Sequence, residues 1–281
     1  MTLRILKIYK KILFRFVKNA IFSPRRIRRD ESFVTGEYSK SWSQNPSAII
    51  MGKKLRRYSI NDRPAYCRLG EFRKLLVSQI HHTVASLRPL TVLELGSGIG
   101  QNIICLAILN PDVKRFVGVE MTEEGVAMAR KMLAEPPMTD LVYLTEQSED
   151  VIRKHLKKTS IEFVQGNIRK LAFKDNEFDF SFSCQVFEQI PRYYLESFRE
   201  VARVTSKNAF FLEEFRESQK NIFQLMHLWN MDYFRWSFHE VEKAGFQVIR
   251  FETLPVANEI LSIGALLAEK NQSKERGVNF V

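Results

Sequence analysis

The stretch 91–107, TVLELGSGIGQNIICLA, constrains the fold more than any other part of this sequence. A short apolar run at 92–95 is followed by three glycines at alternate positions, and apolar residues then return at helical spacing. Gly96, Gly98 and Gly100 permit positive φ and let a ligand come close to the main chain. The pattern therefore predicts a buried strand, a tight turn and a helix whose free N–H groups and positive dipole end point at a ligand.

The spacing of the glycines separates two cofactor classes. A dinucleotide fingerprint, G-x-G-x-x-G, would place its third glycine at position 101, but the chain has Gln101 there and Gly100 one residue earlier. Glu94, two residues before Gly96, is also not part of that fingerprint. The pattern E-x-G-x-G-x-G resembles the first motif of class I S-adenosylmethionine-dependent methyltransferases. Turn chemistry alone is the alternative for this stretch, so the rest of the chain has to decide.

The remainder of the chain alternates predicted strands with predicted helices. Further strands are expected at 115–119, 161–165, 180–184, 208–213, 246–251 and 261–268, and helices at 63–87, 191–204 and 237–244. Residues 135–160 are longer than a minimal connection and are expected to insert one helix, at about 146–157. Residues 33–62 are polar and aromatic and are expected to form an irregular cap. This alternation predicts an α/β fold with a doubly wound, mostly parallel sheet.

The strand at 115–119 ends in Glu120, which lies 24 residues after Gly96. A doubly wound fold places a carboxylate near this position to bind ribose hydroxyls. We therefore expect Glu120 to hold the ribose of a nucleoside cofactor. An ordinary surface carboxylate is the alternative interpretation.

A second segment carries the family resemblance further. Residues 164–192, VQGNIRKLAFKDNEFDFSFSCQVFEQIPR, are similar to the small-molecule branch of methyltransferases that includes the ubiquinone and menaquinone biosynthesis enzymes. Asn167 stands where that pattern has an aspartate near the adenine amino group, and its amide oxygen can accept the same hydrogen bond. Gln189 stands where a histidine is common. The resemblance implies a class I, Rossmann-like methyltransferase with seven strands, the last one antiparallel, behind an N-terminal helical cap.

The resemblance also implies the cofactor, S-adenosyl-L-methionine, and the residues that bind it. Glycines 96, 98 and 100 would meet its methionine part, Glu120 its ribose, and Asn167 and Ile168 its adenine. The full set expected to bind the cofactor is Glu94, Gly96, Ser97, Gly98, Gly100, Glu120, Met121, Asn167, Ile168, Ser183, Cys184 and Gln185. Residues 216–236 would roof the site of the methyl acceptor, near which Glu188, Tyr38 and His227 are the candidate catalytic residues.

The formal charge of +11 is concentrated at one end of the chain. Residues 1–29 hold ten basic residues and no acidic one, and residues 3–22 have the spacing of a basic amphipathic helix with a wide apolar face. That face could pack on the protein itself, dock on an anionic membrane surface, or bind a partner protein or nucleic acid. We expect three parts: residues 1–29 as helix and linker, 30–88 as cap, and 89–281 as the cofactor-binding domain.

Other features limit the location and the acceptor. No apolar run has the length of a transmembrane helix, and the three cysteines are far apart, as is typical of reduced thiols in a cytoplasmic protein. His81 and His82 are adjacent rather than at metal-binding spacing, so no metal is expected. Amino-directed DNA methyltransferases have [ND]-P-P-[YF] where this chain has CQVF, and residues 30–281 are nearly neutral, which argues against a nucleic-acid substrate.

The sequence therefore predicts an enzyme that methylates an oxygen or a carbon of a small or lipid-like molecule. It could be cytoplasmic or peripheral to a membrane, through residues 1–29. A binding or assembly protein that keeps the fold without catalysis is the alternative, because Asn167 and Gln189 depart from the family pattern.

Overall fold

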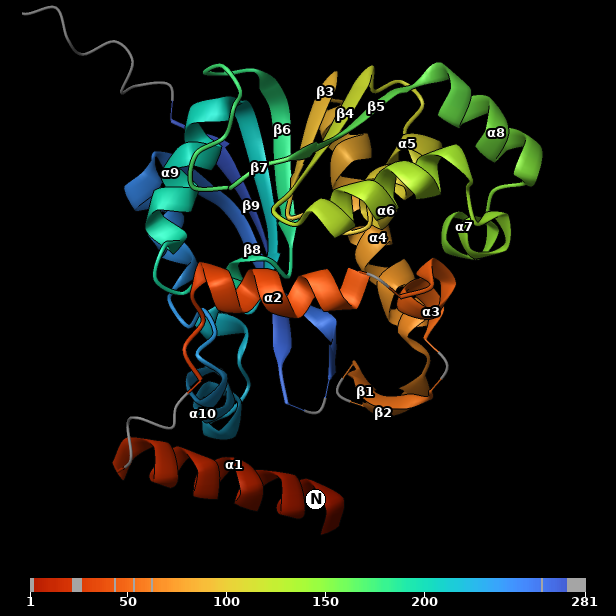
Figure 1. The fold of residues 1–281 in the computed structure, drawn as a ribbon. Helices are drawn as coiled ribbons and strands as arrows, with labels where there is room; N and C mark the ends of the chain where they lie inside the picture. The colour runs from red at the N-terminus through yellow and green to blue at the C-terminus, as the bar shows by residue number, and fades with distance from the viewer. Residues whose placement is uncertain are drawn as a thin grey trace, which may run out of the picture.

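The computed structural model describes residues 3–21, 27–42, 44–52, 54–61, 63–258 and 260–271. A nine-stranded sheet in the order β2-β1-β8-β9-β7-β6-β3-β4-β5 runs through the molecule, with helices on both sides (Figure 1). The strands are β1 (Arg56–Ile60), β2 (Arg63–Cys67), β3 (Thr91–Leu95), β4 (Arg115–Glu120), β5 (Ser160–Gln165), β6 (Phe178–Cys184), β7 (Thr205–Glu213), β8 (Phe246–Asn258) and β9 (Ser262–Lys270). The helices are α1 (Leu3–Ile21), α2 (Glu31–Trp42), α3 (Pro46–Met51), α4 (Leu69–Leu87), α5 (Gln101–Leu109), α6 (Glu123–Ala134), α7 (Met138–Thr145), α8 (Glu149–Lys158), α9 (Tyr194–Val204) and α10 (Ile222–Met231).

The centre of the sheet has the predicted doubly wound arrangement. Strands β7, β6, β3, β4 and β5 are parallel, and β9 runs antiparallel between β7 and β8. Successive residues of a strand point to opposite faces of the sheet. Phe210 and Phe211 of β7 belong to two separate apolar clusters, so one cluster lies on each face. Helices α4 and α5 cover one face, and α9 covers the other. The α/β class and the antiparallel last strand are confirmed.

The predicted number of seven strands is wrong, because the segment 30–88 adds two more. β1 and β2 form a hairpin that turns at Asn61, where φ is +49°. β8 is 13 residues long and extends past the other strands, and its far end pairs with β1 through Ser59 and Ala257. A five-residue polar strand such as β1 has little propensity of its own and depends on this long-range partner.

Four other predicted elements differ in the structure. Residues 33–62, expected to be irregular, contain most of α2, all of α3 and β1, and the helix expected at 63–87 begins only at Leu69. The insertion holds two helices rather than one, because Glu146 leaves α7 in the left-handed region and Ser148 caps α8. Residues 238–244 form a 3₁₀ rather than an α-helix.

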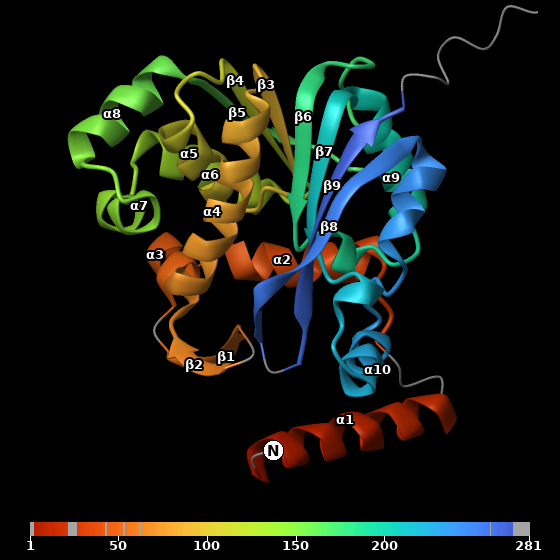
Figure 2. The same cartoon turned by 180° about the vertical axis from the view of Figure 1, so that it is seen from behind.

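Helix α1 packs on the body of the protein through one of its faces. Tyr9 stacks on Phe223 of α10 with 4.2 Å between ring centroids, and Phe16 contacts Trp229 at 4.8 Å. The buried Asn230 side chain donates to the Ile12 carbonyl at 3.0 Å. Figures 1 and 2 show α1 along the lower edge of the molecule, below α10. Another face stays exposed, and none of the described helices has both the length and the apolar character to span a bilayer.

Candidate functional site

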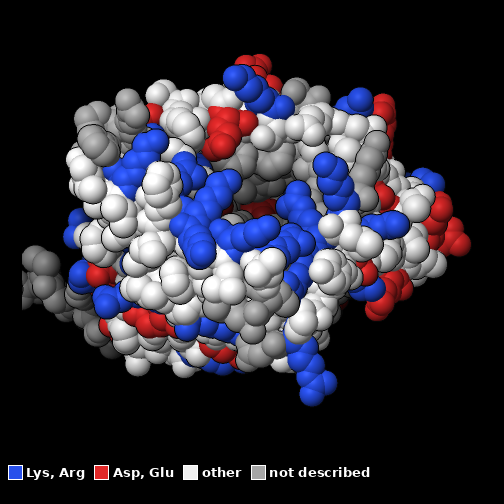
Figure 3. Space-filling view, turned by 90° about the horizontal axis from the view of Figure 1, so that it is seen from below, with Lys and Arg blue, Asp and Glu red and all other residues white. Residues whose placement is uncertain are grey.

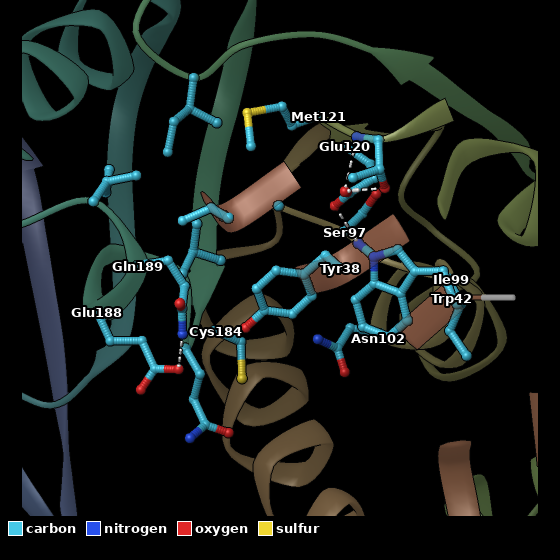
Figure 4. A pocket seen from close by; sticks show the side chains of 18 of the residues that line it. Tyr38, Trp42, Ser97, Ile99, Asn102, Glu120, Met121, Cys184, Glu188 and Gln189 are labelled. Carbon is cyan, nitrogen blue, oxygen red and sulfur yellow. Dashed lines mark hydrogen bonds between the residues drawn. The ribbon is translucent and has the colours of Figure 1, made fainter. Parts of the chain in front are cut away.

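A cavity of about 320 Å³ lies at the carboxyl ends of β3, β4 and β6, where the sheet order reverses direction. Its wall includes the turn at 96–99, residues 120–122, 166–169 and 184–186. Helix α2 crosses this edge of the sheet (Figure 1), and its Tyr38 and Trp42 side chains project into the cavity (Figure 4). Open α/β sheets bind ligands at such a switch point, and the volume falls within the usual range of about 300–1,000 Å³.

The glycines of the turn have two different functions. At Gly98 φ is +51° and a Cβ atom would lie 3.0 Å from the Trp42 ring, so the absence of a side chain lets α2 close over the turn. At Gly100 φ is +77° and a Cβ atom would lie 2.5 Å from the Phe163 ring. Gly100 therefore permits the close packing of α5 on β5 and does not line the cavity.

Glu120 lies in the cavity wall and is fixed by the main chain around it. One carboxylate oxygen accepts the Gly98 N–H at 3.0 Å, and the other accepts the Thr122 N–H at 3.0 Å and the Thr122 hydroxyl at 2.7 Å (Figure 4). These bonds tie the glycine turn after β3 to the end of β4. The carboxylate lies at the end of its strand, as the sequence predicts, and these three hydrogen bonds fix its orientation.

Nine of the twelve predicted cofactor residues line the cavity, and so do two of the three catalytic candidates, Tyr38 and Glu188. The nine are Gly96, Ser97, Gly98, Glu120, Met121, Asn167, Ile168, Cys184 and Gln185. Four predicted residues do not line it: Gly100, Glu94, Ser183 and His227. Glu94 is buried next to the turn, where it accepts a 2.7 Å hydrogen bond from Asn102. Ser183 is buried and donates to Glu213 at 2.6 Å. His227 lies in a different cavity, beside α1, where burial lowers its pKa to about 4.

Polar atoms without a partner gather at one end of the cavity. Among the described residues, eight buried side-chain nitrogen or oxygen atoms make no hydrogen bond, and five of them belong to Trp42, Arg73, Glu94, Ser97 and Gln101. All of these residues except Glu94 line the cavity. Because a buried polar group without a partner costs about 1–3 kcal/mol, this end of the cavity is suited to a polar ligand that bonds these atoms.

Arg73 is a site residue that the sequence pattern does not identify. It projects from α4 and donates to the Gln101 side chain at 2.7 Å, while its Nε has no partner within the described part of the chain. Burial lowers the pKa of this guanidinium, and none of the described carboxylates forms an ion pair with it. A helical arginine is ordinarily assigned to the surface, and only the packing of α4 beside the turn shows that it enters the cavity.

Arg29, which the sequence assigned to the basic tail, is also part of the cavity wall. Only 3% of its side chain is exposed, and its Nε donates to the Met231 carbonyl at 3.0 Å. Its guanidinium bonds the side chains of Glu37 and Gln189 and lies 4.5 Å from the centre of the Tyr233 ring. The tail as predicted, residues 1–29, is therefore not separate from the site.

Three buried glutamates stand at the ends of β6 and β7. Glu213 accepts hydrogen bonds from Ser183 and from the Val186 and Phe187 N–H groups, and burial raises its pKa to about 8. Glu188 lines the cavity and hydrogen bonds Glu214. Burial and the charge of Glu214 raise the pKa of Glu188 well above its usual range. Glu188 is thus the protonated member of a carboxylic acid–carboxylate pair at the cavity.

Comparison with known proteins agrees with this geometry. A family model described as "Methyltransferase domain" matches residues 93–212. This part of the chain, which runs from β3 to β7, is therefore similar to a methyltransferase domain. S-adenosylmethionine is the cofactor of this family. The narrower assignment to the ubiquinone and menaquinone branch stays a prediction.

Individual relatives are distant. A tRNA (guanine-N(7)-)-methyltransferase of Hydrogenovibrio crunogenus is 27% identical over 74 residues, which are 26% of this chain and 30% of the relative, so the chain matches under a third of that protein's length. Magnesium protoporphyrin IX methyltransferase from Synechocystis PCC 6803 was solved with bound S-adenosylhomocysteine (SAH). It superposes with a TM-score of 0.51 at 15% identity over 71% of this chain and 84% of its own. The [4+2]-cyclase SpnF gives a TM-score of 0.58 at 13% identity over 85% and 95%. These structures share the fold.

The residues at the cavity fit S-adenosylmethionine in chemistry. Arg73 offers a carboxylate a cation that has no carboxylate partner among the described residues. Glu94, buried beside the turn, has one oxygen without a partner that can accept from an ammonium, and Glu120 offers oxygens to ribose hydroxyls. Asn167 is already engaged, because its amide oxygen accepts the Arg169 N–H at 3.0 Å and its NH₂ donates to Glu31 at 2.9 Å. No group of three or more His, Cys, Asp or Glu side chains in the described residues could hold a metal ion.

Glu94 makes the stability of the cofactor-free protein sensitive to pH. Burial raises its pKa to about 8 from 4.5, so the folded protein binds a proton that the unfolded chain releases. The stability that depends on this group is complete below the unfolded pKa and declines as the pH rises toward the folded one. We expect the thermal midpoint to fall as the pH rises from about 5 to about 8, and to fall less in Glu94→Gln, which keeps an acceptor for Asn102. The exposed Glu123→Gln is the matched control, and equal slopes for both variants would contradict the prediction.

An asparagine at position 167 suits the hydrogen bond to Glu31, because its NH₂ group donates to the Glu31 carboxylate. Glu31, at the start of α2, accepts from both Asn167 and Arg169, and these bonds lower its pKa. An aspartate would oppose Glu31 and loosen α2 over the cavity. We expect Asn167→Asp to weaken SAH binding about three- to tenfold, corresponding to the loss of one hydrogen bond. Glu31→Gln added to Asn167→Asp should restore affinity, as measured by calorimetry. Tighter binding by Asn167→Asp alone would rule this explanation out.

Proposed function

We propose that this protein transfers the methyl group of S-adenosylmethionine to an oxygen or carbon atom of a small or lipid-like acceptor. The observation that carries the proposal is the shared location of the glycine turn, Glu120 and the partnerless polar atoms of Arg73, Ser97 and Gln101 at one end of a single cavity. Methyl transfer is supported by the family match at residues 93–212. S-adenosylmethionine supplies a methyl group that is activated by its sulfonium charge.

The chain's own residues divide the cavity into two ends. Arg73, Glu94 and the N–H groups of the turn would hold the amino-acid part of the cofactor, and Glu120 the ribose. At the other end stand Tyr38, Cys184 and Glu188 (Figure 4). Burial raises the pKa of Tyr38, so its hydroxyl stays protonated and can donate a hydrogen bond to the acceptor. Tyr38 and Trp42 of α2 also exclude water from the reacting groups.

The carboxyl pair gives the acceptor end a group that can hold or move a proton. Glu188 is protonated and bonds Glu214, while the Gln185 side chain donates to Glu214 at 3.0 Å and the Gln189 side chain donates to Glu188 at 2.5 Å. A protonated Glu188 can donate to an acceptor oxygen, and Glu214 can take a proton through it. Gln189, which replaces the common histidine, orients Glu188 rather than acting as a base.

Cofactor binding separates this proposal from a fold that is kept without catalysis. We expect SAH and S-adenosylmethionine to bind the full chain with one site in calorimetry. Arg73→Met and Glu120→Ala should each weaken binding about ten- to a hundredfold, because each leaves a charged or hydroxyl partner without its hydrogen bond. The control is Lys74→Met. Lys74 is the next residue of α4 and forms its ion pair at the surface, so this variant should bind both ligands like the wild type. Failure of both ligands to bind would leave the binding or assembly protein as the explanation.

The nature of the acceptor can be tested without knowing its name. Methyl-labelled S-adenosylmethionine, the protein and an unlabelled cell extract should yield label in the solvent-extractable fraction. The tRNA-modifying relative makes RNA the competing acceptor, and label in acid-precipitable RNA would overturn a small or lipid-like acceptor. Glu188→Gln is the variant to compare, because it keeps the shape of the side chain at the acceptor end.

The outward face of α1 supports docking on an anionic lipid surface. Leu13, Phe14, Val17 and Ile21 are exposed there, with 71% of Phe14 accessible. Lys7, Lys10 and Lys18 are exposed on the same helix. Apolar side chains flanked by lysines are typical of helices that lie in the membrane interface.

We expect the full chain to sediment with vesicles that contain anionic lipid, and less so at high salt, because the lysines contribute a screened attraction. The double variant Phe14→Asp/Val17→Asp should stay in the supernatant while it still binds SAH. Leu90→Asp, an exposed apolar site at the amino end of β3, should sediment normally. Equal sedimentation of all three proteins would contradict membrane docking by α1.

A further inference from the structure

A second cavity, of about 680 Å³, opens between α1 and the β1–β2 hairpin. Neither the proposed cofactor binding nor the proposed chemistry of the carboxyl pair assigns a function to this cavity. On this side of the molecule Lys and Arg side chains surround a hollow, and acidic atoms are visible at its bottom (Figure 3). The cavity is therefore open to solvent at a face rich in positive charge.

The charged residues that line this cavity are all basic within the described part of the chain. They are Arg4, Lys11 and Arg15 from α1 and Arg56 and Arg57 from the hairpin. Lys11, Arg15 and Arg56 are exposed, and Arg15 contacts the Met231 sulfur at 3.7 Å. His227, which also lines the cavity, has a pKa lowered to about 4 by burial and is neutral near pH 7. Cations from two elements far apart in sequence thus face one space.

Apart from Gln185 and Asn230, the rest of the wall is apolar. Ile8 and Ile12 come from α1, Leu55 and Tyr58 from the hairpin region, and Ile260 from the connection between β8 and β9. Leu55 is 64% exposed although it is a large apolar residue. Cations around an apolar wall are complementary to a molecule with an anionic group and a hydrocarbon body.

The two cavities are neighbours. Leu69, Phe72 and Gln185 line both of them, so the second cavity adjoins the acceptor end of the first. Gln185 bonds Glu214, the partner of Glu188. A molecule that enters past the cations would reach the carboxyl pair and the cofactor through this shared wall.

We propose that the second cavity is the entry and binding site of the methyl acceptor, and that the acceptor is an amphiphile with an anionic group of the phosphate class. Its anionic group contacts Lys11, Arg15 and Arg56 at the mouth, its hydrocarbon part packs on the apolar wall, and the end to be methylated extends past Gln185. This inference rests on the proposed function, because it identifies the chemistry of the acceptor for that same site.

An amphiphile fits this cavity better than RNA does. Single-stranded nucleic acids are held by basic grooves with aromatic platforms for the bases. Here the Tyr58 and Phe72 rings in the wall are buried and stack on each other. The Tyr9 and Phe16 rings of α1 are engaged with α10 rather than free for stacking. The apolar residues exposed on α1 and at Leu55 also favour a lipid-like molecule over a polynucleotide.

The test uses the full chain saturated with SAH and dodecyl phosphate below its micellar concentration as the probe. We expect one dodecyl phosphate to bind per protein in calorimetry. Lys11→Glu/Arg56→Glu should weaken it at least tenfold, because two charge-assisted contacts become repulsive. The matched control is Lys7→Glu/Arg63→Glu, which makes the same charge changes on α1 and on the hairpin at exposed residues outside the cavity and should bind within about twofold of the wild type.

Comparison ligands make the result decisive. Weak or absent binding of inorganic phosphate and of the neutral dodecyl maltoside supports a site for an anionic amphiphile. Equal binding of inorganic phosphate, equal binding of dodecyl maltoside, or equal loss in both double variants overturns it. Binding of tRNA that is lost only in Lys11→Glu/Arg56→Glu would assign the cavity to RNA instead. A protein that binds SAH but not dodecyl phosphate refutes this inference alone, whereas one that does not bind SAH refutes the proposed function.

Discussion

The structure of the site depends on the hydrogen bonds between Glu120 and the glycine turn. The carboxylate ends β4, accepts the Gly98 N–H from the turn after β3, and accepts two bonds from Thr122 at the start of α6. Two strands and the helix after the second are thereby fixed around one carboxylate. Because the main chain at Gly98 has positive φ and no side chain, α2 can place Trp42 directly over it. The carboxylate proposed to bind the ribose, the turn after β3 and the helix that covers the cavity therefore contact one another here.

The segment before the methyltransferase domain completes the cavity rather than only preceding it. Arg29 is held by the Met231 carbonyl and by Asp232, whose carboxylate accepts its main-chain N–H at 2.9 Å. Glu31 is bound to Asn167 and Arg169 on the opposite side. α2 is therefore attached at its amino end to the end of α10 and to the loop after β5, and its Tyr38 and Trp42 side chains line the first cavity. Packing of Tyr9 and Phe16 on α10 holds α1 and its cations beside the second cavity.

The three buried glutamates show that similar residues can have different functions. Glu213 accepts two main-chain N–H groups after β6, so it organises the loop that carries Cys184 and Gln185 toward the cavity. Glu188 and Glu214 share a hydrogen bond, which favours one proton on the pair. Glu188 lines the cavity, whereas Glu213 lies outside its wall. The proposed proton transfer therefore involves the pair, and Glu213 fixes the loop beside it.

The sequence by itself determined the parallel core of the sheet, the glycine turn, the position of Glu120 and the family. These depend on local patterns: an apolar strand, three spaced glycines and a carboxylate at a strand end. Only the tertiary structure decided which distant residues complete the site. Arg73 and Arg29 look like surface cations in sequence, β1 and β2 form because β8 is long enough to pair with them, and His227 is directed to the second cavity by the packing of α10 on α1. Such contacts join residues far apart in the chain, and no local periodicity encodes them.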